Sequence, residues 1–160
     1  MTQIFLGLGS NLEREKNIRA GLAALNNTFG ELILSPVYES ESVGFKGSHF
    51  YNLVVSLQTN LSIAHLSDVL KKIENDHGRV RMGPKYSPRT LDIDILTYGN
   101  FVGVEEGIVL PRAEIIENAF VLLPLSEIAP NEVHPQLKKT YAELWASYDK
   151  NAQALWKINL

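Results

Sequence analysis

Apolar residues recur along this chain with two different periods, which alternate over most of its length. Spacings of three and four residues predict helices over 13–26, 62–76 and, at the end of the chain, 141–147. Short apolar runs predict strands over 4–9, 31–38, 50–59, 91–98 and 107–110. The chain therefore alternates strands with helices, and it contains no internal repeat.

Small polar residues, glycines and a proline mark the expected ends of these elements. Ser10 or Asn11 is expected to cap the first helix, while Gly30 and Gly78 are placed to end the first and second helices. Pro36 cannot donate a ladder hydrogen bond, so it restricts its strand to a sheet edge or a bulge.

Two segments, 39–49 and 78–88, contain glycines and few large apolar side chains, and they are predicted to be loops. Several connections between strands are too short to hold a crossover helix, which favours antiparallel pairing. The expected fold is α+β, with an antiparallel sheet and helices packed on its faces. A length of 160 residues suits one domain over 1–160.

Composition narrows the classes of function. Hydrophobic residues make up 45% and charged residues 21% of the chain, as in ordinary globular proteins. A formal net charge of −3 opposes a broad cationic surface for nucleic acid or an anionic membrane. The absence of cysteine excludes disulfides and thiolate metal sites, so any metal would be bound by oxygen. The first residues show no targeting leader, which predicts a cytoplasmic protein.

Asp92 and Asp94 alternate with apolar residues in the predicted strand 91–98. Alternation by two puts both carboxylates on one face of the strand. Neighbouring anions on one face repel each other, and a hard cation such as Mg²⁺ would relieve this repulsion. The pair therefore indicates a metal site, although a solvated outer face of the sheet would give the same pattern.

A basic segment precedes this strand. Residues 77–91 contain Arg79, Arg81, Lys85 and Arg89 but no acidic residue, in a protein that is acidic overall. Guanidinium groups bind phosphate oxygens through paired hydrogen bonds, so the segment is typical of a polyphosphate site. A solvated basic loop is the alternative, but the adjacent carboxylate pair favours metal-assisted phosphate chemistry.

Other motifs are weaker on their own. Gly7 and Gly9 lack the third glycine of a dinucleotide fingerprint, and the chain has no Walker-type phosphate loop. Phe50 and Asn52 could stack on and hydrogen-bond to a flat heterocycle, but strand aromatics more often belong to the core. Glu74 would most often be a surface charge.

Taken in order, these motifs resemble the 6-hydroxymethyl-7,8-dihydropterin pyrophosphokinase family over nearly the whole chain. The segments that carry the resemblance are 9–12 (GSNL), 50–52 (FYN), Glu74, 78–81 (GRVR), 88–94 (PRTLDID) and 120–125 (FVLLPL). The resemblance implies a ferredoxin-like fold and an enzyme that transfers pyrophosphate from ATP, its co-substrate, to the hydroxymethyl group of a reduced pterin, releasing AMP.

The resemblance also implies roles for individual residues. Two Mg²⁺ ions would be held by Asp92 and Asp94, which with Arg79, Arg81 and Arg89 form the expected catalytic set. ATP would be bound by Lys71, Glu74, Arg81, Lys85, Arg89, Ile95 and Arg112. The pterin would be bound by Ser40, Val43, Phe50, Asn52, Tyr86, Asp92 and Phe120, with its ring between Phe50 and Phe120.

The chain departs from the family pattern mainly after Pro111. Arg112, Ala113 and Asn118 stand where the family commonly has a histidine, a further nucleotide contact and a phosphate-binding arginine, and Ser42, His49, Lys85 and Tyr86 also differ. Alternatives therefore remain, namely a divergent relative that uses another pterin or a regulatory module that binds ATP or pterin without catalysis. A monomer or weak dimer is expected.

Overall fold

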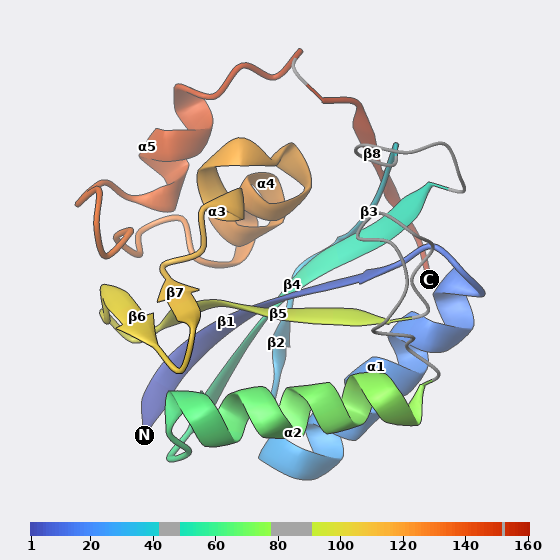
Figure 1. Cartoon of the computed structure of the whole chain (residues 1–160). Helices are drawn as coiled ribbons and strands as arrows, with labels where there is room; N and C mark the ends of the chain where they lie inside the picture. The colour runs from blue at the N-terminus through green and yellow to red at the C-terminus, as the bar shows by residue number, and fades with distance from the viewer. Residues whose placement is uncertain (42–48, 78–90, 152) are drawn as a thin grey trace.

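A six-stranded antiparallel sheet with helices on both faces forms the centre of the molecule (Figure 1). The computed structural model describes residues 1–41, 49–77, 91–151 and 153–160. The strands are β1 (Thr2–Ser10), β2 (Ile33–Leu34), β3 (Val37–Ser40), β4 (Phe50–Thr59), β5 (Asp92–Tyr98), β6 (Gly103–Glu105), β7 (Ile108–Leu110) and β8 (Leu155–Ile158). The helices are α1 (Arg14–Phe29), α2 (Ile63–Asp76), α3 (Glu114–Glu117), α4 (Ala119–Ile128) and α5 (Tyr141–Ala146).

The strand order is β5-β1-β4-β3-β8, with β2 pairing to β4 beside β3, and every pairing is antiparallel. β6 and β7 form a separate two-stranded hairpin. The predicted antiparallel sheet with helices on its faces is therefore confirmed. In the described parts of the chain, no helix is both long and apolar enough to cross a bilayer.

Each face of the sheet packs against its own helices. Ile4, Leu6 and Leu8 of β1 point toward α1 and α2, where they join one buried apolar cluster. On the opposite face Phe5, together with residues of β4 and β5, packs against α3, α4 and α5 in a second cluster. Burial of apolar surface on both faces is the main force that holds the layers together.

Along β1, the second face of the sheet changes from apolar side chains to glycines. Beyond Phe5, the β1 residues on this face are Gly7 and Gly9, which add no side chain to the surface. The apolar cluster therefore gives way to a stretch of sheet where side chains from the neighbouring strands can approach each other over the glycines.

Most predicted element ends hold, with exceptions near turns. Gly30 follows α1 with φ of 81°, a backbone conformation that glycine adopts without strain. The predicted strand 31–38 is divided at Ser35 and Pro36 into β2 and β3, as a bulge at Pro36 would require. β3 continues to Ser40, so residues 39–40 belong to a strand rather than to the predicted loop, and Gly78 lies outside the described residues.

The predicted cap of α1 by Ser10 or Asn11 is wrong. The residue that precedes the helix is Glu13, in a left-handed conformation with φ of 43°, and it makes no side-chain capping bond. Ser10 instead donates its hydroxyl hydrogen bond to the carbonyl of Leu12. The helix thus begins at Arg14, two or three residues later than a cap at Ser10 or Asn11 would place its start.

Candidate active site

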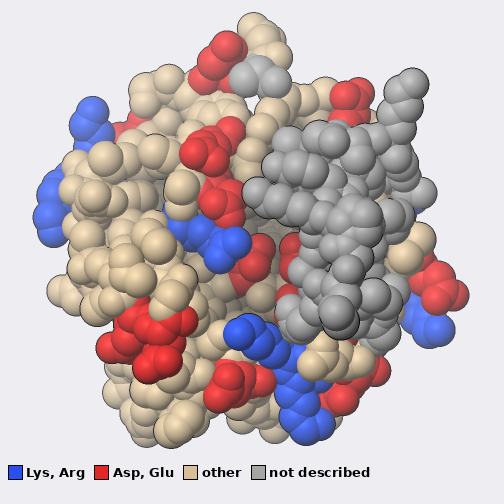
Figure 2. Space-filling model, in the orientation of Figure 1, with Lys and Arg blue, Asp and Glu red and all other residues tan. Residues whose placement is uncertain are grey.

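A cleft of about 180 Å³ lies between α2 and β5. Acidic and basic side chains meet near the middle of the molecular face shown in Figure 2. The cleft is lined by Ser67, Leu70, Lys71, Glu74, Asp92, Ile93, Asp94, Ile95, Ile108 and Arg112. The fold therefore brings together six residues that the sequence assigned to ATP or metal binding: Lys71, Glu74, Asp92, Asp94, Ile95 and Arg112.

Asp92 and Asp94 lie on the same face of β5, as predicted from their spacing. Ile93 lies between the two aspartates and Ile95 follows Asp94. Both isoleucines are 5% exposed and belong to the core on the other face. Burial in the cleft, followed by the charge of Asp92, raises the pKa of Asp94 to about 7, against the opposing effect of Arg112. The two acids thus form an electrostatically strained pair.

Glu74 is buried, with only 4% of its surface exposed, rather than on the surface as its residue type would suggest. Its Oε2 accepts a hydrogen bond of 2.7 Å from the backbone N–H of Ile93. Glu74 therefore holds the stretch of β5 that carries the two aspartates, and its charge also raises the pKa of Asp94.

Arg112 brings a cation to the acidic pair. Its Nη2 lies 3.7 Å from Oδ1 of Asp94, and its Nε forms an ion pair with Glu114. Asn118, by contrast, accepts a hydrogen bond from Gln153 through its Oδ1 at 2.9 Å and does not line the cleft. The arginine at 112 is thus placed to meet an anion in the cleft.

The predicted pterin residues lie farther along the same sheet face. Gly9 of β1 pairs with Asp92 on one side and with Asn52 of β4 on the other. Asn52 is 7% exposed, and its Nδ2 donates a hydrogen bond of 3.1 Å to Oγ of Ser40. A Cβ added to Gly9 would lie 3.6 Å from the ring of Phe50, so this ring also borders the glycine.

Phe120 comes from α4, the helix that covers this face of the sheet, and it is half-buried against the second apolar cluster. The expected residues that lie outside the described part of the chain are Val43, Arg79, Arg81, Lys85, Tyr86 and Arg89. Their roles remain predictions.

Asp92 and Asp94 fit a hard divalent cation by their chemistry. Carboxylate oxygens are the ligands that Mg²⁺ prefers, and a cation would relieve the repulsion that raises the pKa of Asp94. The described residues contain no group of three or more His, Asp or Glu side chains suited to a metal. A metal would therefore depend on these two carboxylates together with oxygens from the substrate.

The family model for 7,8-dihydro-6-hydroxymethylpterin-pyrophosphokinase (HPPK) matches residues 5–130. The chain belongs to this family. The matched region includes α2 and β5, which form the cleft, as well as Asn52 and Phe120 on the adjoining sheet face. The resemblance drawn from the sequence motifs is therefore confirmed.

Curated HPPK relatives match most of the chain. A 2-amino-4-hydroxy-6-hydroxymethyldihydropteridine pyrophosphokinase of Haemophilus influenzae is 36% identical over 139 residues, which cover 84% of this chain and 86% of the relative. The Bacillus subtilis enzyme of the same name is 31% identical over 157 residues, covering 96% of this chain and 89% of the relative.

Solved structures confirm the fold. HPPK-DHPS in complex with substrates superposes with a TM-score of 0.72 at 14% identity, covering 94% of this chain and 44% of that one. Wild-type Plasmodium falciparum HPPK-DHPS with pteroate gives 0.71 at 16% identity, covering 91% and 42%. The chain spans less than half the length of these proteins, and the shared domain has the predicted ferredoxin-like α+β fold.

Four residues of the cleft were not expected from the sequence. Ser67, Leu70, Ile93 and Ile108 line it beside the predicted residues. A signal for Ser67 was present, because it lies four residues before Lys71 and seven before Glu74, on one side of α2. Ile108 offered no signal, since its position depends on how the β6–β7 hairpin folds toward β5.

Proposed function

We propose that this chain transfers pyrophosphate from ATP to the hydroxymethyl group of 6-hydroxymethyl-7,8-dihydropterin. The single observation that carries the proposal is the register Asp92–Gly9–Asn52 across three neighbouring strands. It puts a pair of acids and a buried amide on one sheet face, with only a glycine between them. A metal–phosphate group and a heterocycle bound there would be neighbours.

The proposed reaction is a displacement at phosphorus. The substrate's hydroxyl oxygen forms a bond to the β-phosphorus of ATP and loses its proton, while the bond from the β-phosphorus to the bridging α–β oxygen breaks and AMP leaves. Such reactions depend chiefly on positioning and on neutralising charge, and they need no covalent nucleophile from the protein.

Asp92 and Asp94 would hold Mg²⁺, which when bound supplies positive charge to the phosphate oxygens. Lys71 and Arg112, which line the same cleft, are placed to pair with the triphosphate. On the other side of Gly9, Asn52 would orient the pterin through its amide, and Phe50 and Phe120 would contact the ring. Arg79, Arg81, Lys85 and Arg89 are proposed to add phosphate contacts, as the resemblance implies.

AMP formation from ATP and the reduced pterin tests this proposal. We expect AMP in proportion to the pterin consumed, loss of turnover on chelation of divalent ions, and recovery when Mg²⁺ is restored. Asp94→Ala should abolish turnover without loss of the folded state, because the side chain faces the cleft and not the core. Asp68→Ala, at an exposed position of α2, is the matched control.

One observation favours a second candidate. Arg112 already pairs with both Asp94 and Glu114, so part of the acidic charge is neutralised within the protein itself. A divergent relative with weak catalysis, or a module that binds ATP and pterin without reaction, would show this arrangement. Binding of both ligands without AMP would identify this second function. Cytoplasmic location and a monomeric or weakly dimeric state stay predictions.

A further inference from the structure

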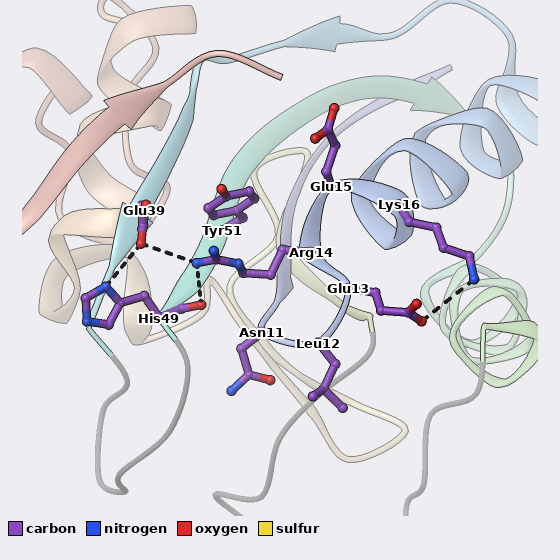
Figure 3. Close-up of a pocket in the computed structure, with 9 residues that line it drawn as sticks. All are labelled: Asn11, Leu12, Glu13, Arg14, Glu15, Lys16, Glu39, His49 and Tyr51. Carbon is purple, nitrogen blue, oxygen red and sulfur yellow. Dashed lines mark hydrogen bonds and ion pairs between the residues drawn. The ribbon is translucent and has the colours of Figure 1, made fainter.

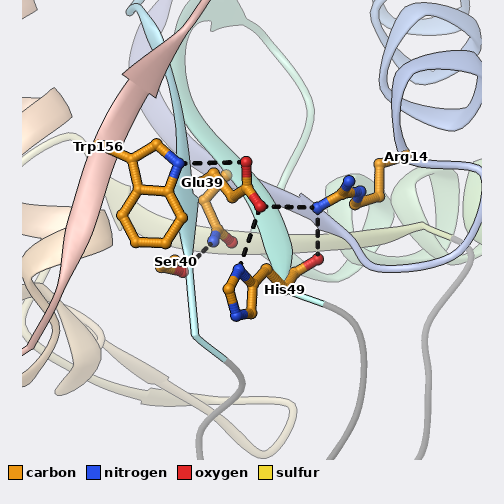
Figure 4. A network of polar contacts seen from close by, with 6 residues as sticks. Arg14, Glu39, Ser40, His49 and Trp156 are labelled. Carbon is orange, nitrogen blue, oxygen red and sulfur yellow. Dashed lines mark hydrogen bonds and ion pairs between the residues drawn. The ribbon is translucent and has the colours of Figure 1, made fainter.

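A polar network lies on the face of the sheet opposite the pterin residues, near the start of α1 (Figure 4). We call it the Glu39 network, and it consists of Arg14, Glu39, His49, Tyr51 and Trp156. These residues come from four parts of the fold: the start of α1, the end of β3, the start of β4 with the residue before it, and β8. Nothing in the proposed chemistry uses them directly.

Glu39 is the centre of the network. Its Oε2 lies 3.3 Å from Nη1 of Arg14 and 3.1 Å from Nδ1 of His49, while its Oε1 accepts a hydrogen bond of 3.2 Å from Nε1 of Trp156. Partial burial raises the pKa of Glu39, but the hydrogen bonds from His49, Arg14 and Trp156 outweigh burial and leave this pKa below its ordinary value. The carboxylate is therefore held in its charged form.

Arg14 links Glu39 to the start of β4. The same Nη1 donates a hydrogen bond of 3.1 Å to the backbone carbonyl of His49, and the guanidinium lies 4.0 Å from the centre of the Tyr51 ring. One arginine thus fixes both the end of β3 and the segment that leads into β4 (Figure 3). A lysine could keep the charge, but it lacks the planar guanidinium group that combines these hydrogen bonds with stacking on Tyr51.

A cavity of about 760 Å³ lies beside the network (Figure 3). The two cations among its lining residues are already paired with carboxylates of the same cavity, Arg14 with Glu39 and Lys16 with Glu13. The charges there are balanced within the protein, which favours a structural role for the network.

The network lies directly behind the pterin residues. Glu39 pairs with Tyr51 and with Trp156 in register, and the next pair along is Ser40 with Phe50. Because side chains alternate across a strand, Glu39 and Tyr51 point to one face while Ser40, Phe50 and Asn52 point to the other. The hydrogen bond from Asn52 to Ser40 spans the same two strands that Arg14 joins from behind.

We propose that the Glu39 network positions the pterin-binding face, with Arg14 as a positioning residue that acts through the carboxylate of Glu39 and the backbone carbonyl of His49. Loss of Arg14 would let the end of β3 and the start of β4 shift. This shift would displace Ser40, Phe50 and Asn52. The cleft that holds Lys71, Glu74 and Arg112 lies beyond β1, on β5 and α2, and its described lining residues include no member of the network. The effect should therefore fall on the pterin and not on ATP.

This inference rests on the proposed function, and steady-state kinetics of AMP formation tests it. Arg14→Met should raise the KM for the pterin about tenfold, as expected for misplacement of binding groups, while the KM for ATP stays within about twofold of wild type. Arg14→Lys should restore part of the loss. Arg19→Met is the matched control, because Arg19 lies on the same helix in an exposed ion pair with Glu15.

A second measurement does not depend on turnover. In NMR spectra of the ligand-free protein, the side-chain amide resonances of Asn52 should move in Arg14→Met and stay in place in Arg19→Met. If Arg14→Met does not fold, Trp156→Phe, which removes one hydrogen bond to Glu39 and keeps a ring beside His49, should move the same resonances.

The outcomes separate the two proposals. An active wild type, with unchanged pterin KM and unmoved Asn52 resonances in Arg14→Met, would overturn the positioning role. A wild type that forms no AMP would overturn the proposed function, while the Asn52 resonances would still decide whether the network holds this face. An equal rise in the KM for both substrates would also contradict the inference, because it would show general loosening.

Discussion

The carboxylate of Glu74 accepts a hydrogen bond from the backbone N–H of Ile93, the residue that separates Asp92 from Asp94. β5 is the outermost strand on its side of the described sheet and pairs only with β1 there, so its outward N–H groups need partners from elsewhere. α2 supplies one through Glu74. A buried side chain thus sets where the two acids stand.

Removal of this acceptor should damage both stability and activity. Glu74→Ala leaves a buried N–H without its partner, which should cost about 1–3 kcal/mol of unfolding free energy and lower AMP formation. Glu74→Gln keeps an acceptor oxygen and should be much less destabilised. Urea denaturation and AMP assays on both variants measure the difference, and equal stability of Ala and Gln variants would contradict the role given to this bond.

The two glycines of β1 on the site face should respond differently to substitution. A Cβ on Gly9 would come within 2.8 Å of Oδ1 of Asn52, whose amide is held by Ser40, whereas the nearest atom to a Cβ on Gly7 would be Cδ2 of Leu96, at an ordinary contact distance of 3.5 Å. Gly9→Ala should therefore displace Asn52 and weaken pterin binding, and Gly7→Ala should bind normally. Pterin titration by fluorescence measures both, and similar affinities for the two variants would rule out the steric account.

Stability should fall in mild acid because of His134. Burial lowers the pKa of His134 below its ordinary value of 6.5, and its Nδ1 accepts hydrogen bonds from the backbone N–H groups of Gln136 and Leu137. As pH drops through 6.5, His134 binds a proton in the unfolded chain but not yet in the folded protein. The free energy of unfolding therefore decreases.

His134→Asn removes the titrating group and offers an oxygen as acceptor in place of Nδ1. Urea denaturation from pH 7 to about pH 5 should therefore show a shallower decline for this variant than for wild type. His65→Asn, at an exposed position of α2, serves as control and should decline like wild type. A variant at 134 with the wild-type slope would assign the acid sensitivity to other groups.

Glu13 should be replaceable by glycine with a gain in stability. Its φ of 43° is a left-handed conformation that costs an L-residue roughly 1–2 kcal/mol, and glycine adopts it freely at the cost of extra entropy in the unfolded chain. The lost ion pair with Lys16 is exposed and contributes little. Glu13→Gly should raise the melting temperature slightly, and a clear decrease would show that Glu13 has another role.

The sequence predicted the parts of the fold where one periodic signal dominates. Alternation in 91–98 placed Asp92 and Asp94 on one face, and helical spacing predicted α2, because each pattern reflects burial on one side only. It did not predict α4, which is apolar on most sides and contains Pro124, so no helical period stands out. β8 was missed because a short edge strand carries too few alternating residues.

The residues of the candidate site were named on a different basis, and their roles stay predictions. Lys71, Glu74, Ile95 and Arg112 were named from the family resemblance, since side chains from separate elements meet only after folding. Burial of Glu74 depends on an N–H of β5 that the sequence does not reveal. The Glu39 network was missed entirely, because its residues are far apart along the chain, with 117 positions between the hydrogen-bonded residues Glu39 and Trp156.

The two apolar clusters on opposite faces of the sheet should restrict local opening of the strands between them. β1 and β4 are covered by helices from both sides, so their amide protons should be the last to exchange with deuterated solvent. Gly9 and Asn52 belong to this pair of strands. The place where the two substrates would meet is thus attached to the part of the protein that opens least often.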